Sequence, residues 1–125
     1  MKHFTLLELT VTHSGLPNIP NEEQVKNLEI GVENLLDPLR EMYGKPIIVN
    51  SGFRTPAVNK AVNGSPTSNH MTGQAFDITC EDNMFLFQLI KKHFAFDQLI
   101  NEYDYSWVHV SYRGEANRHQ IFSLP

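Results

Sequence analysis

Two histidines and one aspartate stand out as candidate metal ligands. His70 and Asp77 lie in the segment Ser-Asn-His-Met-Thr-Gly-Gln-Ala-Phe-Asp, with Gly73 between them, and His109 follows in Trp-Val-His-Val. Two imidazoles and one carboxylate are ligands that zinc accepts, and three protein ligands leave a fourth position for water. That arrangement is typical of a catalytic zinc site. Spacing alone leaves open the alternative of an ordinary surface histidine and strand aspartate.

The alternation of apolar residues indicates where two of these side chains point. Asp77 stands between two apolar residues in a predicted strand at 74–79, and His109 stands between two valines in a predicted strand at 107–112. Successive side chains of a strand point to opposite faces of the sheet. Asp77 and His109 are therefore both expected on the face turned away from the core.

The remaining pattern predicts an α+β fold with a mainly antiparallel sheet and helices packed on one face. Apolar residues at helical spacing predict a helix that begins near Val25 and ends at Gly44, with a kink or restart at Pro38. Thr55 and Pro56 are typical of the start of a short helix. The other predicted elements are a strand at 46–50, a helix at 82–94, and a strand at 96–101 that a tight turn at 103–106 joins to the last strand.

Length and composition predict one domain, residues 1–125, with a core of ordinary size. The net charge of −4 argues against a nucleic-acid-binding protein, which would carry a basic stripe. No apolar run is long enough for a membrane span, and the N-terminus does not resemble a signal peptide. We therefore expect no membrane insertion and a protein that is cytoplasmic as synthesised. The single Cys80 excludes an intramolecular disulfide and is expected to be a buried thiol.

Three motifs carry a family resemblance. Ser-x-His-x-x-Gly-x-Ala-x-Asp at 68–77, followed by Trp-Val-His at 107–109, resembles the zinc D,D-peptidases of peptidase family M15. This family includes D-Ala-D-Ala carboxypeptidases, D,D-dipeptidases and phage endolysins. Ser-Gly-Phe-Arg-Thr-Pro at 51–56 resembles the arginine motif of the same group. The likeness runs from about residue 4 to residue 112, is nearest to small members often encoded in phages and prophages, and implies a hedgehog/D,D-peptidase-like fold with zinc on the open face of the sheet.

The resemblance also implies roles for individual residues. His70, Asp77 and His109 match the zinc ligands of the family. Arg54 matches the arginine that holds a substrate oxygen or stabilises the tetrahedral oxyanion, and Ser68 matches a serine that lines the substrate site. A fixed guanidinium is well suited to meet the negative charge that develops on an oxyanion.

The general base departs from the family pattern. Many members carry an acid three residues before the last zinc histidine, where this chain has Ser106. Glu102 is our choice of catalytic acid, because a hairpin would bring the end of its strand beside His109. Asp104 is the alternative, although an aspartate in a turn often bonds its own backbone. Asp97, at the start of the same strand, is expected to cap or bridge structurally.

The leading hypothesis is a zinc peptidase that hydrolyses a bond involving a D-amino acid in peptidoglycan, as a carboxypeptidase or an endopeptidase. Its partner would be a peptidoglycan peptide or muropeptide, and the protein is expected to be a monomer. Lack of a signal peptide fits release to the cell wall by a phage lysis system, or a cytoplasmic role on wall precursors. The alternatives are a non-catalytic, zinc-containing, cell-wall-binding domain of the same fold, and a metal-free peptidoglycan-binding module.

Overall fold

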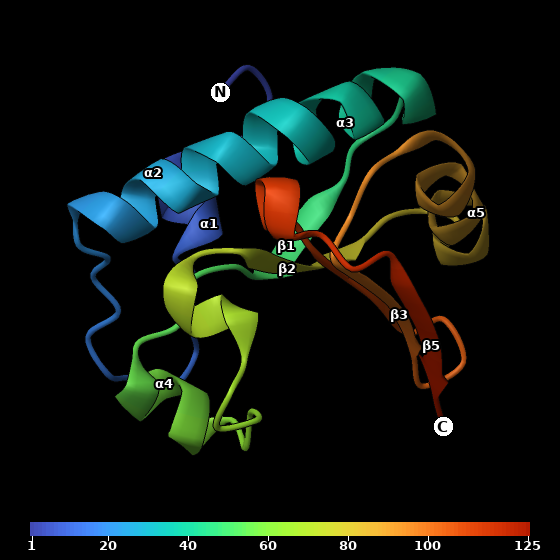
Figure 1. Ribbon diagram of the computed structural model, residues 1–125. Coiled ribbons are helices and arrows are strands. Elements are labelled where there is room, and N and C mark those ends of the chain that lie inside the picture. Colours follow the sequence, from blue (N-terminus) through green and yellow to red (C-terminus); the bar gives the residue numbers. More distant parts are fainter.

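A five-stranded sheet organises the molecule (Figure 1). The computed structural model describes residues 1–125, and the strands lie in the order β1-β2-β4-β3-β5. Their bounds are β1 Ile48–Ser51, β2 Ala75–Thr79, β3 Gln98–Glu102, β4 Trp107–Ser111 and β5 Gln120–Leu124. Only the β3–β5 pair is parallel, so the predicted mainly antiparallel sheet is confirmed. The sequence pattern does not predict the edge strand β5, because residues 120–124 lack the clear alternation of the inner strands.

One long helical segment covers one face of the sheet. It consists of α2 (Glu22–Gly31), a π-helical segment η1 (Val32–Leu36) and α3 (Asp37–Tyr43), and it ends at Gly44 with a φ of 77°. Pro38 lies in the first turn of α3. Proline lacks a backbone donor and its ring crowds the preceding turn. The disruption predicted at Pro38 therefore takes the form of a π-helical segment directly before α3, within a helix that does not break.

The core lies between this helical segment, α5 (Asn83–His93) and the sheet. Gly31 allows the end of α2 to lie close to β2, since a Cβ there would lie 2.8 Å from the ring of Phe76. The apolar residues that alternate with Asp77 and His109 are all fully buried, as the strand pattern predicts. They are Phe76, Ile78, Val108 and Val110.

The opposite face carries α4 (Pro56–Ala61) and the short 3-10 helix η2 (Asn69–Thr72), which lie below the sheet in Figure 1. Thr55 caps α4 through a bond from the Val58 N–H, so the predicted short helix is confirmed. A polar loop joins α4 to η2. This layer leaves part of the sheet face uncovered, and the candidate site lies there.

A short helix near the N-terminus, α1 (Leu6–Leu9), anchors the segment that follows β1. The carbonyl oxygen of Leu9 accepts a 2.8 Å bond from the backbone N–H of Phe53. A Cβ on Gly52 would lie 2.4 Å from the same oxygen, so the two backbones meet at a point where only glycine fits. The sequence pattern does not predict α1, because four residues are too few to show a helical period.

Cys80 directly follows β2 and packs against the core, but it is half-buried instead of fully buried, because the chain leaves the sheet at this point. No helix here combines the length and the apolar character that a membrane crossing requires.

Candidate active site

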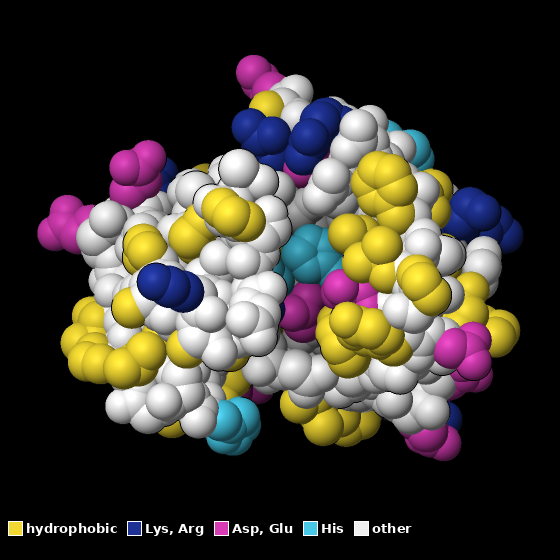
Figure 2. Space-filling model, turned by 90° about the horizontal axis from the view of Figure 1, so that it is seen from below, with side chains coloured by type: hydrophobic (Ala, Val, Ile, Leu, Met, Phe, Trp, Pro, Cys, Tyr) yellow, Lys and Arg dark blue, Asp and Glu magenta, His cyan; other side chains and the backbone are white.

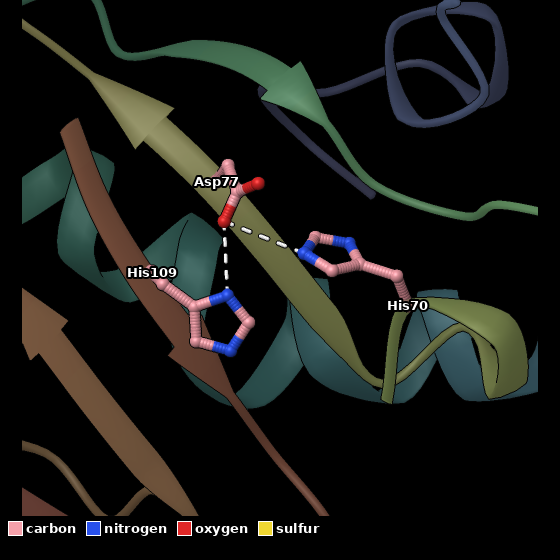
Figure 3. A group of neighbouring side chains, drawn as sticks. All are labelled: His70, Asp77 and His109. Atoms are coloured by element: carbon pink, nitrogen blue, oxygen red, sulfur yellow. Dashed lines mark hydrogen bonds and ion pairs between the residues drawn. The ribbon is translucent and has the colours of Figure 1, made fainter. Parts of the chain in front are cut away.

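The sheet register brings two of the predicted ligands face to face. β2 and β4 are antiparallel neighbours, and Asp77 lies directly opposite His109. Side chains of directly opposite residues project to the same face of a sheet. His70 reaches the same point from η2, so that the Asp77 carboxylate lies between the two imidazoles (Figure 3).

The three side chains form a compact group. Asp77 Oδ1 lies 2.9 Å from His109 Nδ1 and 3.3 Å from His70 Nε2. One potential ligand atom from each residue lies within 4.8 Å of the others, and this group could hold a metal ion. The structure thus brings together three residues that are far apart in the sequence.

His70 has the surroundings of a metal-binding histidine. Its Nδ1 lies 2.6 Å from the carbonyl oxygen of Gly52, and because a carbonyl only accepts, Nδ1 carries the proton. Nε2 therefore has a free lone pair, and this buried atom has no hydrogen-bond partner. A buried polar atom without a partner is costly, and histidine ligands commonly donate their other N–H to a carbonyl. The residues present therefore fit a zinc ion.

Asp77 is held as an anion. Burial pushes the pKa of its carboxyl upward, but the adjacent imidazoles, with His109 Nδ1 at 2.9 Å and His70 Nε2 at 3.3 Å, outweigh burial and bring the pKa well below its usual range. Arg54 adds a 3.0 Å bond from Nη2 to Oδ2. An ionised carboxylate is the form that ligates a metal.

Arg54 is fixed in place at the edge of the cleft. Its Nε donates to Ser51 Oγ at 2.8 Å, and its Nη1 donates to Asn59 Oδ1 at 3.2 Å. The backbone N–H of Arg54 also donates to the carbonyl of His70 at 3.0 Å. The arginine motif and the histidine motif are therefore joined through both backbone and side chains.

An open cleft of about 810 Å³ contains all of these groups. Histidine and acidic side chains show at the bottom of the hollow in Figure 2, and hydrophobic side chains gather along one side of it. One wall is the polar loop after α4, and the other is formed by β3, β4 and β5. The hydrophobic lining residues are Val62, Ile100, Tyr103, Trp107 and Leu124.

The two candidate acids lie in different places. Glu102 lines the cleft, opposite Trp107 in the β3–β4 register, and its Oε2 accepts a 2.7 Å bond from Trp107 Nε1. Asp104 is exposed in the turn between the strands, with a φ of 55°, and does not line the cleft. Ser68 does line the cleft, and its hydroxyl accepts a bond from the His70 N–H at 3.1 Å.

Sequence reasoning missed three residues at or near the site. Arg113 and Arg118 line the cleft from the segment after β4, where no element is predicted. Asn59 lies behind Arg54 and is 3% exposed. The only signal for Asn59 is a polar residue one turn after the N-cap of a short helix, which also fits an exposed position.

The comparison with protein families agrees with this geometry. The model of the family described as Peptidase M15 matches residues 2–111, which include all three members of the His-Asp-His group and Arg54. The search of curated proteins found no match. M15 peptidases are zinc peptidases, so the match supports a metallopeptidase with a possible metal site. With most of its length matched, the chain belongs to the peptidase M15 family.

Proposed function

We propose that the protein is a zinc-dependent peptidase that hydrolyses a bond involving a D-amino acid in peptidoglycan peptides. The observation that carries the proposal is the unpartnered His70 Nε2, buried beside the ionised Asp77 at the bottom of an open cleft. A purely structural histidine would have a partner for this atom. The family match supports peptidase chemistry, and the motif resemblance supports the D-amino acid.

Zinc would be held by His70 Nε2, Asp77 Oδ1 and His109 Nδ1. When bound, zinc supplies a Lewis acid that polarises a carbonyl and makes water more acidic. Gly52 orients His70 through its carbonyl, and Arg54 orients Asp77 through Oδ2. Such outer contacts fix the direction of the ligands and keep the site ready for the ion.

Arg54 would bind the oxygen of the scissile carbonyl. A guanidinium has five N–H donors, and three are used by Ser51, Asn59 and Asp77. The remaining donors are available on a residue that lines the cleft. Their positive charge would stabilise the oxyanion that develops as the carbonyl is attacked.

Glu102 is our candidate for proton transfer. Trp107 Nε1 fixes Oε2, which leaves Oε1 free to take a proton from the attacking water and deliver it to the leaving amine. Glu102 is a diagonal neighbour of His109 across the β3–β4 pair, on the cleft face. Diagonal neighbours are about 7–8 Å apart, a spacing that supports a carboxylate reaching a water beside the ligands.

Purified, zinc-loaded protein tests the proposal on muropeptides that differ only in whether the residue at the cleavable bond is D or L. We expect a new amine from the D peptide and none from the L control. Terminal D-alanine release would indicate a carboxypeptidase, and internal cleavage would indicate an endopeptidase. Bound zinc without a new amine from any muropeptide would rule the proposal out.

Glu102→Gln tests the proton-transfer role, with Asp104→Asn as the matched control in the neighbouring turn. We expect Glu102→Gln to retain zinc and to lose about 10²- to 10⁴-fold in kcat, the usual contribution of a general base. Asp104→Asn should keep its activity. The reverse result would transfer the role to Asp104.

A non-catalytic, zinc-containing, cell-wall-binding domain is the second candidate. The observation that favours it is Ser106, at the position where many family members carry an acid. Its hydroxyl donates to the carbonyl of Tyr103 at 2.6 Å and offers no carboxylate. This candidate predicts zinc-dependent binding of wall fragments that remain intact after prolonged incubation.

A further inference from the structure

We propose that Asn59 is a positioning residue that holds the Arg54 guanidinium in its working orientation; this inference rests on the proposed function. Asn59 lies in α4, is 3% exposed and does not line the cleft, so it does not touch substrate. Its Oδ1 accepts from Arg54 Nη1 at 3.2 Å, and its Nδ2 donates to the carbonyl of Ser65 at 2.9 Å. Both polar atoms of the amide are therefore used.

The Asn59 contact matters because of where the other two side-chain contacts of Arg54 lie. Ser51 Oγ binds Nε and Asp77 Oδ2 binds Nη2, so without Asn59 the guanidinium could still tilt about the line joining these two contacts. Asn59 is the third point, on Nη1, and three points define a plane. The N–H donors left for substrate are on the two Nη atoms, and their direction follows the orientation of this plane. An error of about 1 Å in such a group can lower the rate about 10²-fold.

Gly64 shows how closely this support is packed. A Cβ on Gly64 would lie 2.0 Å from Asn59 Oδ1 and 3.0 Å from Arg54 Nη1. The N–H of Gly64 donates to the carbonyl of Asn59 at 2.8 Å. Its φ is outside the left-handed region, so space and not backbone conformation requires glycine here. The cleft loop is thus pressed against the Asn59–Arg54 contact.

Asn59→Ala is the primary variant, and Thr55→Ala is its matched control. Thr55→Ala removes the cap of α4, so it loosens the same helix without removing a partner of Arg54. We expect Asn59→Ala to lower kcat about 10- to 100-fold with zinc retained and KM little changed. Thr55→Ala should lower stability but leave kcat within about twofold.

A double-mutant cycle separates positioning from general stability. If Asn59 acts through Arg54, Asn59→Ala should cause no further loss of kcat in an Arg54→Ala background. Asn59→Asp keeps an acceptor for Arg54 but loses the donor to Ser65, and it should recover most of the lost kcat. Additive losses in the cycle, together with no recovery by Asn59→Asp, would overturn the proposal.

A measurement independent of turnover keeps this inference distinct from the proposed function. The ¹H–¹⁵N nuclear Overhauser effect of the Arg54 Nε–Hε group reports how rigid the guanidinium is. We expect it to fall in Asn59→Ala and to remain unchanged in Thr55→Ala. If the wild type cleaves no muropeptide, the proposed function fails while this comparison still decides the role of Asn59. An unchanged signal in Asn59→Ala would show that Asn59 does not hold Arg54.

Discussion

Two buried aspartates next to the same cleft have very different surroundings. Asp77 pairs with Arg54 at 3.0 Å, and Asp97 pairs with Arg118 at 2.8 Å. Asp77 is 8% exposed and Asp97 is fully buried. In both, the carboxyl pKa lies below its usual range. Neither the ion pair nor the pKa therefore distinguishes a reactive site from a structural one.

The partners distinguish them. Asp97 receives bonds from the backbone N–H, Nε and Nη2 of Arg118, and from the side chains of Asn69 and Ser111. All of these are donors, so the charge is fully matched. The Oδ1 atom of Asp77 instead faces two imidazoles. One of them, His70, turns Nε2 toward this oxygen, and Nε2 has no hydrogen-bond partner. An incomplete set of partners beside open space indicates a place for a ligand.

Asp97 secures the part of the cleft wall that lies after residue 111, beyond the M15 family match. Its carbonyl accepts from the N–H of Gln120, and the carbonyl of Phe96 accepts from the N–H of His119. With the Arg118 pair, these bonds hold the segment that leads into β5 against the start of β3. The structural role expected for Asp97 is confirmed, and the bridge extends to a segment that the sequence pattern left without an element.

The largest expected effect, on zinc binding and activity, comes from removing any one of the three candidate metal ligands. His70→Ala, Asp77→Ala and His109→Ala should each lose bound zinc and reduce peptidase activity to background, because two remaining ligands hold the ion weakly. Zinc per folded chain and amine release are the measurements. Any of the three variants that retains both zinc and activity would show that its residue is not a ligand.

Removing the fully paired carboxylate of Asp97 should affect stability and not zinc binding. Asp97→Ala should lower the free energy of unfolding by up to about 3 kcal/mol, the low end for a broken buried pair, because Arg118 is partly exposed and can be hydrated. Urea unfolding measures this loss. Zinc bound per folded chain should match the wild type. A normal unfolding midpoint would contradict the role that we assign to Asp97.

Zinc itself should distinguish the two aspartates. At 100 times its dissociation constant, zinc should stabilise the wild type by about 2.7 kcal/mol through mass action. Asp97→Ala should show the same increment and Asp77→Ala should show none. Thermal unfolding with zinc and with a chelator gives both values. Equal increments in the two variants would remove the distinction between the two sites.

The smallest expected effect is the loss of stability from the Asp97–Arg118 pair at low pH. Arg118 holds the pKa of Asp97 below its usual value of 3.8. The stability from this pair is therefore fully present above about pH 4 and is lost as pH falls through the lower pKa of the folded state. Asp97→Asn should flatten the decline of the unfolding free energy below about pH 4, and the exposed control Asp104→Asn should not. A decline that is unchanged in Asp97→Asn would assign it to other carboxylates.

Local patterns predicted much of the fold. The apolar stripe that begins at Val25 corresponds to α2, η1 and α3, and the cap at Thr55 corresponds to the start of α4. These signals depend on neighbours within one or two turns. By contrast, α1 and β5 depend on distant partners, such as the Leu9 carbonyl with Phe53 and the pairing of β5 with β3. Short elements held by such contacts leave little trace in their own sequence.

Local sequence is enough to define the donor types of the site and the sheet face of Asp77 and His109, because strand alternation is a local property. The folded chain adds three relations: Asp77 lies opposite His109, His70 reaches them with an unpartnered nitrogen, and Arg54 donates a hydrogen bond to Asn59. These are relations between segments far apart in the chain. Register, burial and exact partner count follow from how the layers pack, and no single segment contains them.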